Sequence, residues 1–242
     1  MDEVELLPRR FHFYWEASEL QLVNYLAVKS LLDHHPGDEV FLHYQNPPCQ
    51  CPYWKRLAEI PELRMKPYSL ESLLRECALS QFDCDSFESR AKANHRSDLA
   101  RYLLLYRYGG IYLDMDVLVL KPLLPLLKFG FFAAFQYYGR GRNNLNGAIL
   151  GSRAGEPILW ELLKGCAKAA GTEREYTWAE FGPTLLTDTL LPSSSSDRMI
   201  LLLLAALERL SLANSSLADA LVRTMSRKQS IGILPRDRKS VV

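Results

Sequence analysis

The first third of the chain alternates short apolar runs with longer segments in which apolar residues recur every three or four positions. The short runs predict buried strands, and the longer spacing predicts helices that pack one side on a core. The expected strands are Phe11–Trp15, Val40–Tyr44 and Leu63–Tyr68, and the expected helices are Ser18–His34 and Tyr53–Ile60. This alternation predicts an α/β fold with a mixed, mostly parallel sheet flanked by helices.

The middle of the chain contains a sharp transition from helix to strand. A helix is expected over Lys92–Tyr108, and Gly109-Gly110 ends it, because glycine readily adopts the left-handed conformation that closes many helices. The following run, Ile111–Leu120, is the strongest strand pattern in the chain. Residues 70–89 are less regular and predict a helix followed by a loop.

Further strands and helices are expected in the second half, separated by a polar loop that holds Arg140 and Arg142 and by a serine-rich loop, Ser193–Ser196. The expected strands are Phe131–Tyr138, Leu145–Ser152 and Ile231–Leu234, and the expected helices are Glu156–Ala170, Thr184–Leu191, 198–211 and 216–227. No internal repeat is visible. We therefore expect residues 1–242 to form a single domain.

The composition is that of an ordinary globular chain. Hydrophobic residues make up 48% of the 242 residues and charged residues 24%, so neither disorder nor a fibrous repeat is indicated. The formal net charge is +1, which leaves no excess of basic residues to neutralise many phosphates. A nucleic-acid partner is therefore not expected.

No segment of the sequence predicts a membrane span or a secretion signal. The longest apolar run, Met199–Leu207, is closed by Glu208 and Arg209 and is shorter than the ~20 residues that a spanning helix needs. The first residues are acidic, whereas a signal peptide begins with basic and then apolar residues. Taken alone, this pattern predicts no transmembrane segment and favours a cytoplasmic location.

The chain has an odd number of cysteines and no CxxC pair, which argues against a zinc site or a complete set of disulfides. The five are Cys49, Cys51, Cys77, Cys84 and Cys166. We expect reduced thiols. The alternative, in an oxidising compartment, is one or two local disulfides within residues 49–84.

Asp114 and Asp116 stand within the apolar run 111–120. Aspartate is depleted in strands, and side chains alternate along a strand, so both acids are expected to point to the same side. Two neighbouring carboxylates beside an apolar core are costly unless a cation lies between them. A divalent ion binds carboxylate and phosphate oxygens, so two acids and a diphosphate would complete its shell. The alternative is a pair of solvated acids at a strand end.

Asp98 and Arg101 lie three residues apart on the expected helix, so they share one side of it. Taken alone, this spacing indicates an exposed ion pair that contributes a few tenths of a kcal/mol. The helix leads through the glycine pair into the acidic strand. The spacing itself does not bring the start of the helix close to the acids.

The stretch from Ser97 to Asp116 resembles the DXD-motif sugar-binding family of glycosyltransferases. The shared pattern reads S-D-L-A-R-Y-x-x-L-Y-x-Y-G-G-I-Y-L-D-x-D and is far more specific than the two acids alone. The family includes yeast Golgi mannosyltransferases, inositol-phosphoceramide mannosyltransferases and lactosylceramide galactosyltransferases, and it resembles clostridial glucosylating toxins. The resemblance, which covers roughly residues 11–191, implies a GT-A type nucleotide-diphospho-sugar transferase fold.

The resemblance also implies roles for individual residues. Asp98 and Arg101 stand where the family contacts the hydroxyls of the donor sugar, and Tyr112 stands beside the nucleotide. Asp114 stands where the family approaches the ribose and the sugar, and Asp116 where it ligates the metal. Both acids are expected to serve catalysis and metal binding, Asp116 before Asp114.

Three further segments resemble the same family. Phe11–Trp15 resembles its first strand, where backbone and an aromatic residue hold the base, and Trp15 is expected either there or in the core. Asn144–Ile149 resembles an asparagine segment, in which Asn146 is expected in the donor pocket or, alternatively, in a turn. Phe181-Gly182-Pro183 resembles a Thr-Gly-Pro motif with phenylalanine in place of threonine.

The implied activity is that of a metal-dependent, retaining hexosyltransferase. It would use Mn²⁺, or Mg²⁺, and move a hexose from a UDP- or GDP-sugar to a glycan, glycolipid or protein hydroxyl. Retention needs no second carboxylate, because a departing phosphate oxygen can take the acceptor proton. The family resemblance implies glycan biosynthesis in the Golgi. Arg140 and Arg142 are expected to meet phosphate or to remain solvated.

The end of the chain departs from the family. Relatives close with a histidine and a Ser-Trp pair that complete the metal and diphosphate site, whereas no histidine follows His95 here. We therefore expect a domain truncated at its C-terminus. An inactive nucleotide-sugar-binding or structural module is the alternative hypothesis, and a metal-dependent phosphohydrolase is a third one with little support in the sequence.

Overall fold

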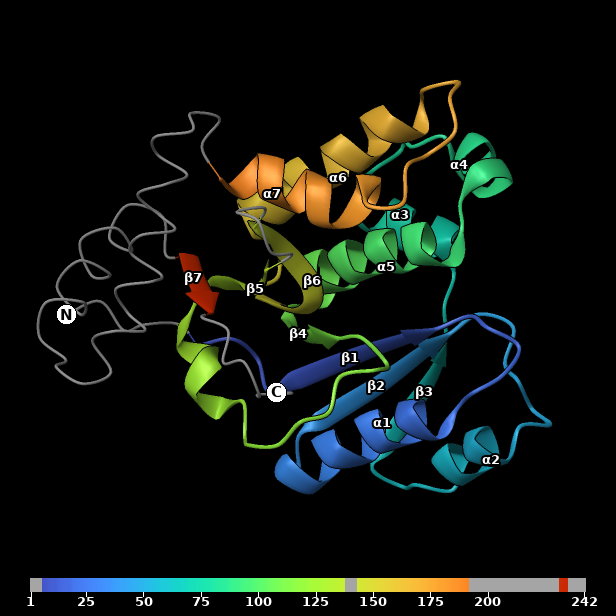
Figure 1. Cartoon of the computed structure of the whole chain (residues 1–242), viewed down its shortest axis with the longest axis vertical. Coiled ribbons are helices and arrows are strands. Elements are labelled where there is room, and N and C mark those ends of the chain that lie inside the picture. The colour runs from blue at the N-terminus through green and yellow to red at the C-terminus, as the bar shows by residue number, and fades with distance from the viewer. Residues whose placement is uncertain (1–5, 138–142, 192–230, 235–242) are drawn as a thin grey trace, which may run out of the picture.

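A seven-stranded mixed sheet organises the described part of the chain (Figure 1). The structure is a computed structural model that describes residues 6–137, 143–191 and 231–234. The strand order is β3-β2-β1-β4-β6-β5-β7, in which β1 to β4 run parallel and β6 runs antiparallel to β4 and β5, while β7 is parallel to β5. The predicted α/β fold with a mixed sheet is confirmed.

Most elements lie within a few residues of the predicted ranges. The strands are β1 (Arg10–Trp15), β2 (Glu39–Tyr44), β3 (Leu63–Pro67), β4 (Gly110–Leu113), β5 (Phe131–Tyr137), β6 (Asn143–Ser152) and β7 (Ile231–Leu234). The helices are α1 (Leu22–His34), α2 (Pro52–Ala58), α3 (Leu70–Glu76), α4 (Cys84–Arg90), α5 (Ala93–Tyr108), α6 (Pro157–Ala170) and α7 (Leu185–Leu190), with the short helical turns η1 (Leu124–Lys128) and η2 (Glu180–Thr184).

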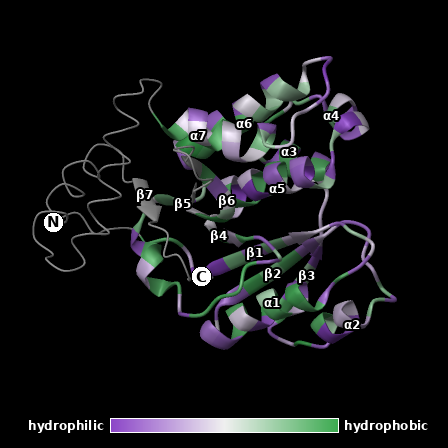
Figure 2. Ribbon diagram, viewed as in Figure 1, coloured by the Kyte–Doolittle hydropathy of each residue, from purple (hydrophilic) through white to green (hydrophobic). Residues whose placement is uncertain are grey.

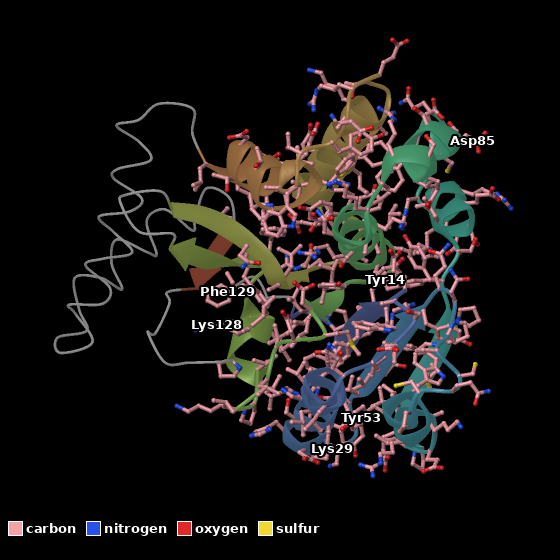
Figure 3. The ribbon with its side chains drawn as sticks, turned by 45° about the vertical axis from the view of Figure 1, so that its right-hand side comes forward. Tyr14, Lys29, Tyr53, Asp85, Lys128 and Phe129 are labelled. Carbon is pink, nitrogen blue, oxygen red and sulfur yellow. The ribbon has the colours of Figure 1, made fainter. Side chains whose placement is uncertain are left out.

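Helices cover both faces of the sheet, and the strands separate two apolar clusters (Figure 1). Helices α1 and α2 pack on one face, where β1 contributes Phe11 and Phe13. Helices α5, α6 and α7 lie on the other, where β1 contributes Tyr14 (Figure 3). Side chains alternate along a strand, so one strand serves both clusters. Hydrophobic and hydrophilic residues alternate along the helices, as expected for elements with one buried side (Figure 2).

Helix α1 begins later than predicted. Ser18 was the predicted cap, whereas Gln21 precedes the first helical residue and forms a reciprocal pair of capping hydrogen bonds with Asn24. Leu22 and Leu26, which fit the predicted helical spacing, are exposed. The buried side of the helix is built from shorter residues instead: Asn24, Ala27, Val28 and Leu31.

The glycine pair ends α5 as predicted, and close approaches explain why both residues are glycine. Gly109 has a φ of 64° and Gly110 a φ of 105°, in the region that favours glycine. A β-carbon on Gly110 would collide with the backbone oxygen of Arg10 in β1. A β-carbon on Gly109 would lie 2.8 Å from the backbone nitrogen of Ala154. The chain can therefore pass from α5 straight into the centre of the sheet.

The strand predicted over Ile111–Leu120 is only partly correct, because β4 ends at Leu113. Its pairing with β1 extends no further than Tyr112, and the chain then turns. Beyond the turn, Val119 is buried against the core without strand pairing, whereas Leu120 is exposed. Asp114 and Asp116 therefore follow the strand, and the prediction that they share one side of a strand is wrong.

Residues 70–89 form two short helices, α3 and α4, rather than the predicted helix and loop. The side chain of Ser69 accepts a hydrogen bond from the backbone of Ser72, and that of Asp83 accepts one from Ser86. Such caps stabilise the first turn of a helix. The second cap is the signal that the sequence analysis missed.

The structure also addresses the predictions about cysteines and membrane spans. All five cysteines are free thiols, as the preferred prediction stated. Within the described ranges, none of the helices combines the length and apolar character needed to cross a bilayer. The predictions for Arg140, Arg142, Ser193–Ser196 and the helices at 198–211 and 216–227 fall outside the described residues.

Candidate functional site

A tight turn after β4 carries the two acids. The backbone nitrogen of Asp114 donates to the oxygen of Ala148 at 2.8 Å, which continues the pairing of β4 with β6 by one residue. The nitrogen of Val117 then donates to the oxygen of Asp114 at 3.1 Å and closes the turn. Asp116 is exposed at its tip, whereas the side chain of Asp114 is 28% exposed. One short turn thus presents two carboxylates in different surroundings.

Helix α1 holds this turn in place. The amide nitrogen Nδ2 of buried Asn24 donates to the backbone oxygen of Met115 at 2.9 Å, and the Met115 side chain is buried in the core. Further along, the nitrogen of Val119 donates to the hydroxyl of Ser30 at 2.9 Å. Sequence reasoning missed both anchors. One sequence feature could have revealed the first anchor. Asn24 stands three and four residues before Ala27 and Val28, so helical spacing puts it on the buried side of α1.

Arg101 joins α5 to the acidic turn. Its guanidinium nitrogen NH2 lies 3.1 Å from an oxygen of Asp98 and 3.1 Å from an oxygen of Asp114. The Arg101 and Asp98 side chains are only 6% and 7% exposed, so the prediction of an exposed ion pair is wrong. Helix α5 is packed between the sheet and α6, and this side of it is buried. The buried position makes the pair a structural centre of the site.

Burial and mutual charge shift the pKa of each member of this group. Burial raises the pKa of Asp98 to about 6, with Arg101 opposing the shift and Asp114 adding to it. Burial likewise raises the pKa of Asp114 against the effect of Arg101, and the charge of Asp116 adds to it. Burial lowers the pKa of Arg101, but Asp114 and Asp98 outweigh it and the net shift is upward. Two carboxylates share one guanidinium here, and the charge of Asp116 acts on Asp114 from the tip of the turn.

Two glycines make room for the buried ion pair. A β-carbon on Gly182 would lie 2.5 and 2.6 Å from the two carboxylate oxygens of Asp98, and one on Gly147 would collide with the guanidinium of Arg101. Gly182 belongs to η2, and Gly147 belongs to β6. The resemblance marked both segments without assigning these glycines a role. Their role is steric, since any side chain would displace a charged group.

The ring of Tyr112 packs against the guanidinium of Arg101. The guanidinium lies 5.0 Å from the centre of the buried Tyr112 ring, within the range of a cation–π contact. The tyrosine hydroxyl lies 3.0 Å from the hydroxyl of Ser97, which also accepts from Arg101 at 3.3 Å. Tyr112 thus helps to fix Arg101. Its predicted place beside a nucleotide stays a prediction.

The end of β1 carries Trp15, whose indole nitrogen is unpaired among the described residues, and Glu16, which binds Arg96 of α5. The Nε1 of half-buried Trp15 is enclosed and has no hydrogen-bond partner within the described ranges, which is rare for a buried donor. Next to it, both carboxylate oxygens of Glu16 accept from Nε of Arg96, at 2.9 and 3.0 Å, and one accepts from the Tyr14 hydroxyl at 2.6 Å. The contact between Glu16 and Arg96 fixes the end of β1 against the first turns of α5.

Asn146 lies in strand β6, at an irregularity of its pairing with β5. Its side-chain oxygen accepts from the backbone nitrogen of Ala148 at 2.7 Å, at the place where the register between β5 and β6 shifts. The backbone oxygen of Ala148 in turn holds Asp114. Asn146 therefore lies within a strand and not in the turn that was the alternative prediction, two residues before the contact with Asp114. Its predicted place in the donor pocket stays a prediction.

A cavity of about 320 Å³ lies elsewhere, between β1–β3 and helices α3 and α5. Its lining includes Arg10, His12, His43, Arg64 and Lys66. None of the predicted site residues lines it. The acidic turn and this cavity are therefore separate features of the molecule.

Comparison with known proteins gives a family match that includes part of the site described above. Residues 23–132, which include α5 and both acids of the turn, match the family described as glycosyltransferase sugar-binding region containing DXD motif. The chain is 25% identical over 166 residues to inositol phosphoceramide mannosyltransferase 3 of Schizosaccharomyces pombe, covering 68% of this chain and 38% of that protein. It is 27% identical over 193 residues to lactosylceramide 4-alpha-galactosyltransferase of Rattus norvegicus, covering 72% and 49%. The chain thus spans less than half the length of these relatives.

A solved structure supports the same fold. The PaToxG glycosyltransferase superposes with a TM-score of 0.63 at 15% identity, covering 93% of this chain and 86% of that chain. At this identity the likeness shows the fold alone, and that fold is of the GT-A type, as the resemblance implied.

Proposed function

We propose that this chain transfers a hexose from a nucleotide sugar to a hydroxyl acceptor, because residues 23–132 match the DXD-containing sugar-binding region of glycosyltransferases. The observation that carries the proposal is the position of Arg101, which lies within 3.1 Å of both Asp98 and Asp114. A buried guanidinium held between two carboxylates has a desolvation cost, and such groups with shifted pKa values are concentrated at functional sites.

Asp116 and Asp114 are the residues that would hold a divalent cation, Mn²⁺ or Mg²⁺. Asp116 is exposed at the tip of the turn, and no third histidine, cysteine or acid completes a cluster beside the pair in the described part of the chain. Such hard cations bind one or two carboxylates and fill their shells with phosphate oxygens and water, so this pair fits. When bound, the ion offsets the negative charge that develops on a departing nucleoside diphosphate.

The other residues of the site would bind and orient the donor. Asp98 and Arg101 would hold hydroxyls of the donor sugar, and Tyr112 would keep the guanidinium in place. The Trp15 indole has an unused hydrogen-bond donor at the end of β1, where it could serve the base of the nucleotide. Asn146 would contribute to the donor pocket from beside the acidic turn.

We propose retention of the anomeric configuration. Asp98 and Asp114 both contact Arg101, and Asp116 is assigned to the metal, so the described residues of the site leave no further carboxylate to act as a base. A departing phosphate oxygen can take the proton from the acceptor hydroxyl instead. Retention would be tested by proton NMR of the anomer that is formed first, before mutarotation.

The donor would be a UDP- or GDP-hexose, and the acceptor a glycan, glycolipid or protein hydroxyl. The two relatives named above are a mannosyltransferase of inositol phosphoceramide and a galactosyltransferase of lactosylceramide. Their names make a glycolipid hydroxyl the first acceptor to test. GDP-mannose and UDP-galactose are the first donors.

The test is a thermal-shift panel of UDP- and GDP-hexoses with and without manganese, together with a measurement of nucleoside diphosphate release. One donor at ~100 times its Kd should raise the midpoint by roughly 5–10 °C in the presence of manganese, because only the native state binds it. Replacing Asp116 with asparagine should abolish the manganese-dependent part of the shift and lower release about 100-fold or more. Asp85→Asn, an exposed acid on α4, is the matched control (Figure 3).

Three outcomes separate the hypotheses. Donor binding with turnover supports the transferase. Donor binding without hydrolysis or transfer supports the inactive sugar-nucleotide-binding module. A complete absence of manganese-dependent shifts with every donor contradicts both.

A further inference from the structure

Trp178 is the most exposed large hydrophobic residue in the described part of the chain, with 68% of its surface accessible. It stands in the segment between α6 and η2. Indole is the largest apolar side chain, and leaving it in water is unfavourable unless a partner covers it. None of the residues to which sequence reasoning assigned a role lies in this loop.

The backbone around Trp178 is firmly held, so its exposure does not come from a loose loop. The oxygen of Trp178 accepts from Nδ2 of Asn94 at 2.7 Å. The oxygen of the preceding Thr177 lies 3.0 Å from Nε2 of His95, and its nitrogen donates to Glu180 at 2.9 Å. These bonds hold the backbone from which the indole extends.

The aromatic residues on either side of Trp178 are buried. Tyr176 and Phe181 pack edge to face with ring centres 4.9 Å apart, and both also contact the ring of His95. The segment therefore places two aromatic residues into the core and directs a third one outward. The contrast points to a role for the exposed ring.

This segment lies beside the proposed donor site. Asn94, which holds Trp178, and Asp98 are four residues apart on α5, so they share a side and lie about 6 Å apart along the helix axis. At the other end of the segment, Gly182 abuts the carboxylate of Asp98. The Trp178 backbone is thus anchored within about one helical turn of the ion pair.

We propose that Trp178 is the platform on which a sugar ring of the acceptor stacks. This inference rests on the proposed transferase function and names the part of the site that receives the acceptor. One face of a pyranose ring carries C–H bonds, which pack on the electron-rich face of an indole. Its hydroxyls point outward around the rim of that contact.

The surroundings of the indole favour a sugar over a lipid or a protein surface. The exposed neighbours in the same segment are polar, namely Glu173, Arg174, Glu175 and Thr177. Lipid and protein contacts use contiguous apolar patches, whereas the exposed residues next to Trp178 in the chain are polar. An isolated aromatic ring with a polar rim matches a ligand that has an apolar face and many hydroxyls.

The test compares Trp178→Ala and Trp178→Phe with wild type. Acceptor binding is followed by saturation-transfer NMR with lactose and with methyl α-mannoside, in the presence of manganese and the nucleotide selected by the thermal-shift panel. Transfer to each sugar and hydrolysis of the donor without acceptor are measured alongside. Leu26→Ala, an exposed apolar residue on α1, is the control.

Trp178→Ala should abolish the NMR contacts and raise the acceptor KM about 10-fold or more, with donor hydrolysis within about 2-fold of wild type. Trp178→Phe should restore most of the affinity, because a ring remains. Unchanged acceptor KM in Trp178→Ala, equal loss of donor hydrolysis, or wild type without contact to either sugar overturns the inference. Failure of the proposed function can be told apart from failure of this inference. If the chain is not a transferase, no donor raises the midpoint in the thermal-shift panel, and the inference falls with the proposed function.

Discussion

Arg101 of α5 and Asp114 of the turn after β4 approach to 3.1 Å, although a glycine pair and a strand separate them in the chain. The same guanidinium nitrogen also lies 3.1 Å from Asp98. One side chain therefore fixes the position of the acidic turn relative to the helix. Since Arg101 is buried and Asp114 is partly buried, the loss of this link should affect stability and activity together.

Arg101→Met should destabilise the fold by ~3–5 kcal/mol near neutral pH, because it leaves buried carboxylates without a countercharge. Urea unfolding at pH 7 and pH 5 measures the effect. Burial already raises the pKa of Asp98 to about 6, and removal of Arg101 should raise that pKa further. The folded variant then takes up a proton more readily at pH 5, so the loss of stability should be smaller there.

The matched control for this prediction is Arg107→Met. Arg107 also pairs with an acid, Glu76, at 2.9 Å, but both side chains are largely open to solvent. Exposed pairs contribute at most ~1 kcal/mol. A similar loss in both variants, or a loss in Arg101→Met that does not depend on pH, would contradict the account of the buried group.

The elements of this site could be predicted from the sequence more readily than their contacts. The helix, the glycine pair and the start of β4 follow from local pattern, because spacing and glycine conformation act over a few residues. The end of β4 does not follow from local pattern. The apolar residues after Leu113 fit a strand, and only pairing with β1 and β6 decides where the strand stops.

The burial of Asp98 and Arg101 was likewise beyond local pattern. Their spacing fits an exposed pair equally well, and the deciding factors are η2 and β6, which are distant in the chain and bring Gly182 and Gly147 against the two side chains. Family resemblance had already singled out these two residues. It did not supply the physical reason, which is the tertiary packing around them.

Asn24 should act as a positioning residue for the acidic turn. Asn24→Asp keeps an oxygen that accepts the capping hydrogen bond from Gln21 but loses the donor to the backbone of Met115. Under the proposed function, the manganese concentration for half-maximal activity should rise about 10-fold, with kcat largely recovered at saturating metal. A metal titration of donor hydrolysis measures this.

Gln21→Ala is the control for helix capping, because Gln21 forms the other half of the capping pair without contacting the turn. Its metal dependence should equal that of wild type. If Asn24→Asp lowers activity equally at all manganese concentrations, the residue serves folding only.

Gly182→Ala should displace Asp98, since the added β-carbon would lie 2.5 Å from a carboxylate oxygen. Forcing a methyl group into a packed site costs ~1–3 kcal/mol. We expect that loss in urea unfolding, together with a loss of donor hydrolysis. Gly171→Ala, whose β-carbon would meet only ordinary contacts at 3.7 Å, should leave both properties nearly unchanged.

His12 and Asp98 should give the stability of the protein opposite dependences on pH. Burial lowers the pKa of His12 from 6.5 to about 4, so between these values the unfolded state holds a proton that the folded state lacks. Its contribution to stability therefore rises with pH from about 4 to 6.5, with a limiting slope of ~1.4 kcal/mol per pH unit. Burial raises the pKa of Asp98 from 3.8 to about 6, so its contribution falls as pH rises through that range.

Single variants should separate the two slopes. In His12→Gln an amide remains to donate to the oxygen of Gly109, which lies 3.0 Å from the histidine nitrogen, but no group titrates there. Its free energy of unfolding, measured in urea from pH 4 to 7, should fall relative to wild type as pH rises. Asp98→Asn should show the reverse. Burial also lowers the pKa of His43, whose Nε2 lies 3.0 Å from Nδ1 of His12. If the rise of stability with pH survives in His12→Gln and disappears only when His43 is also replaced, the titrating group is His43 instead.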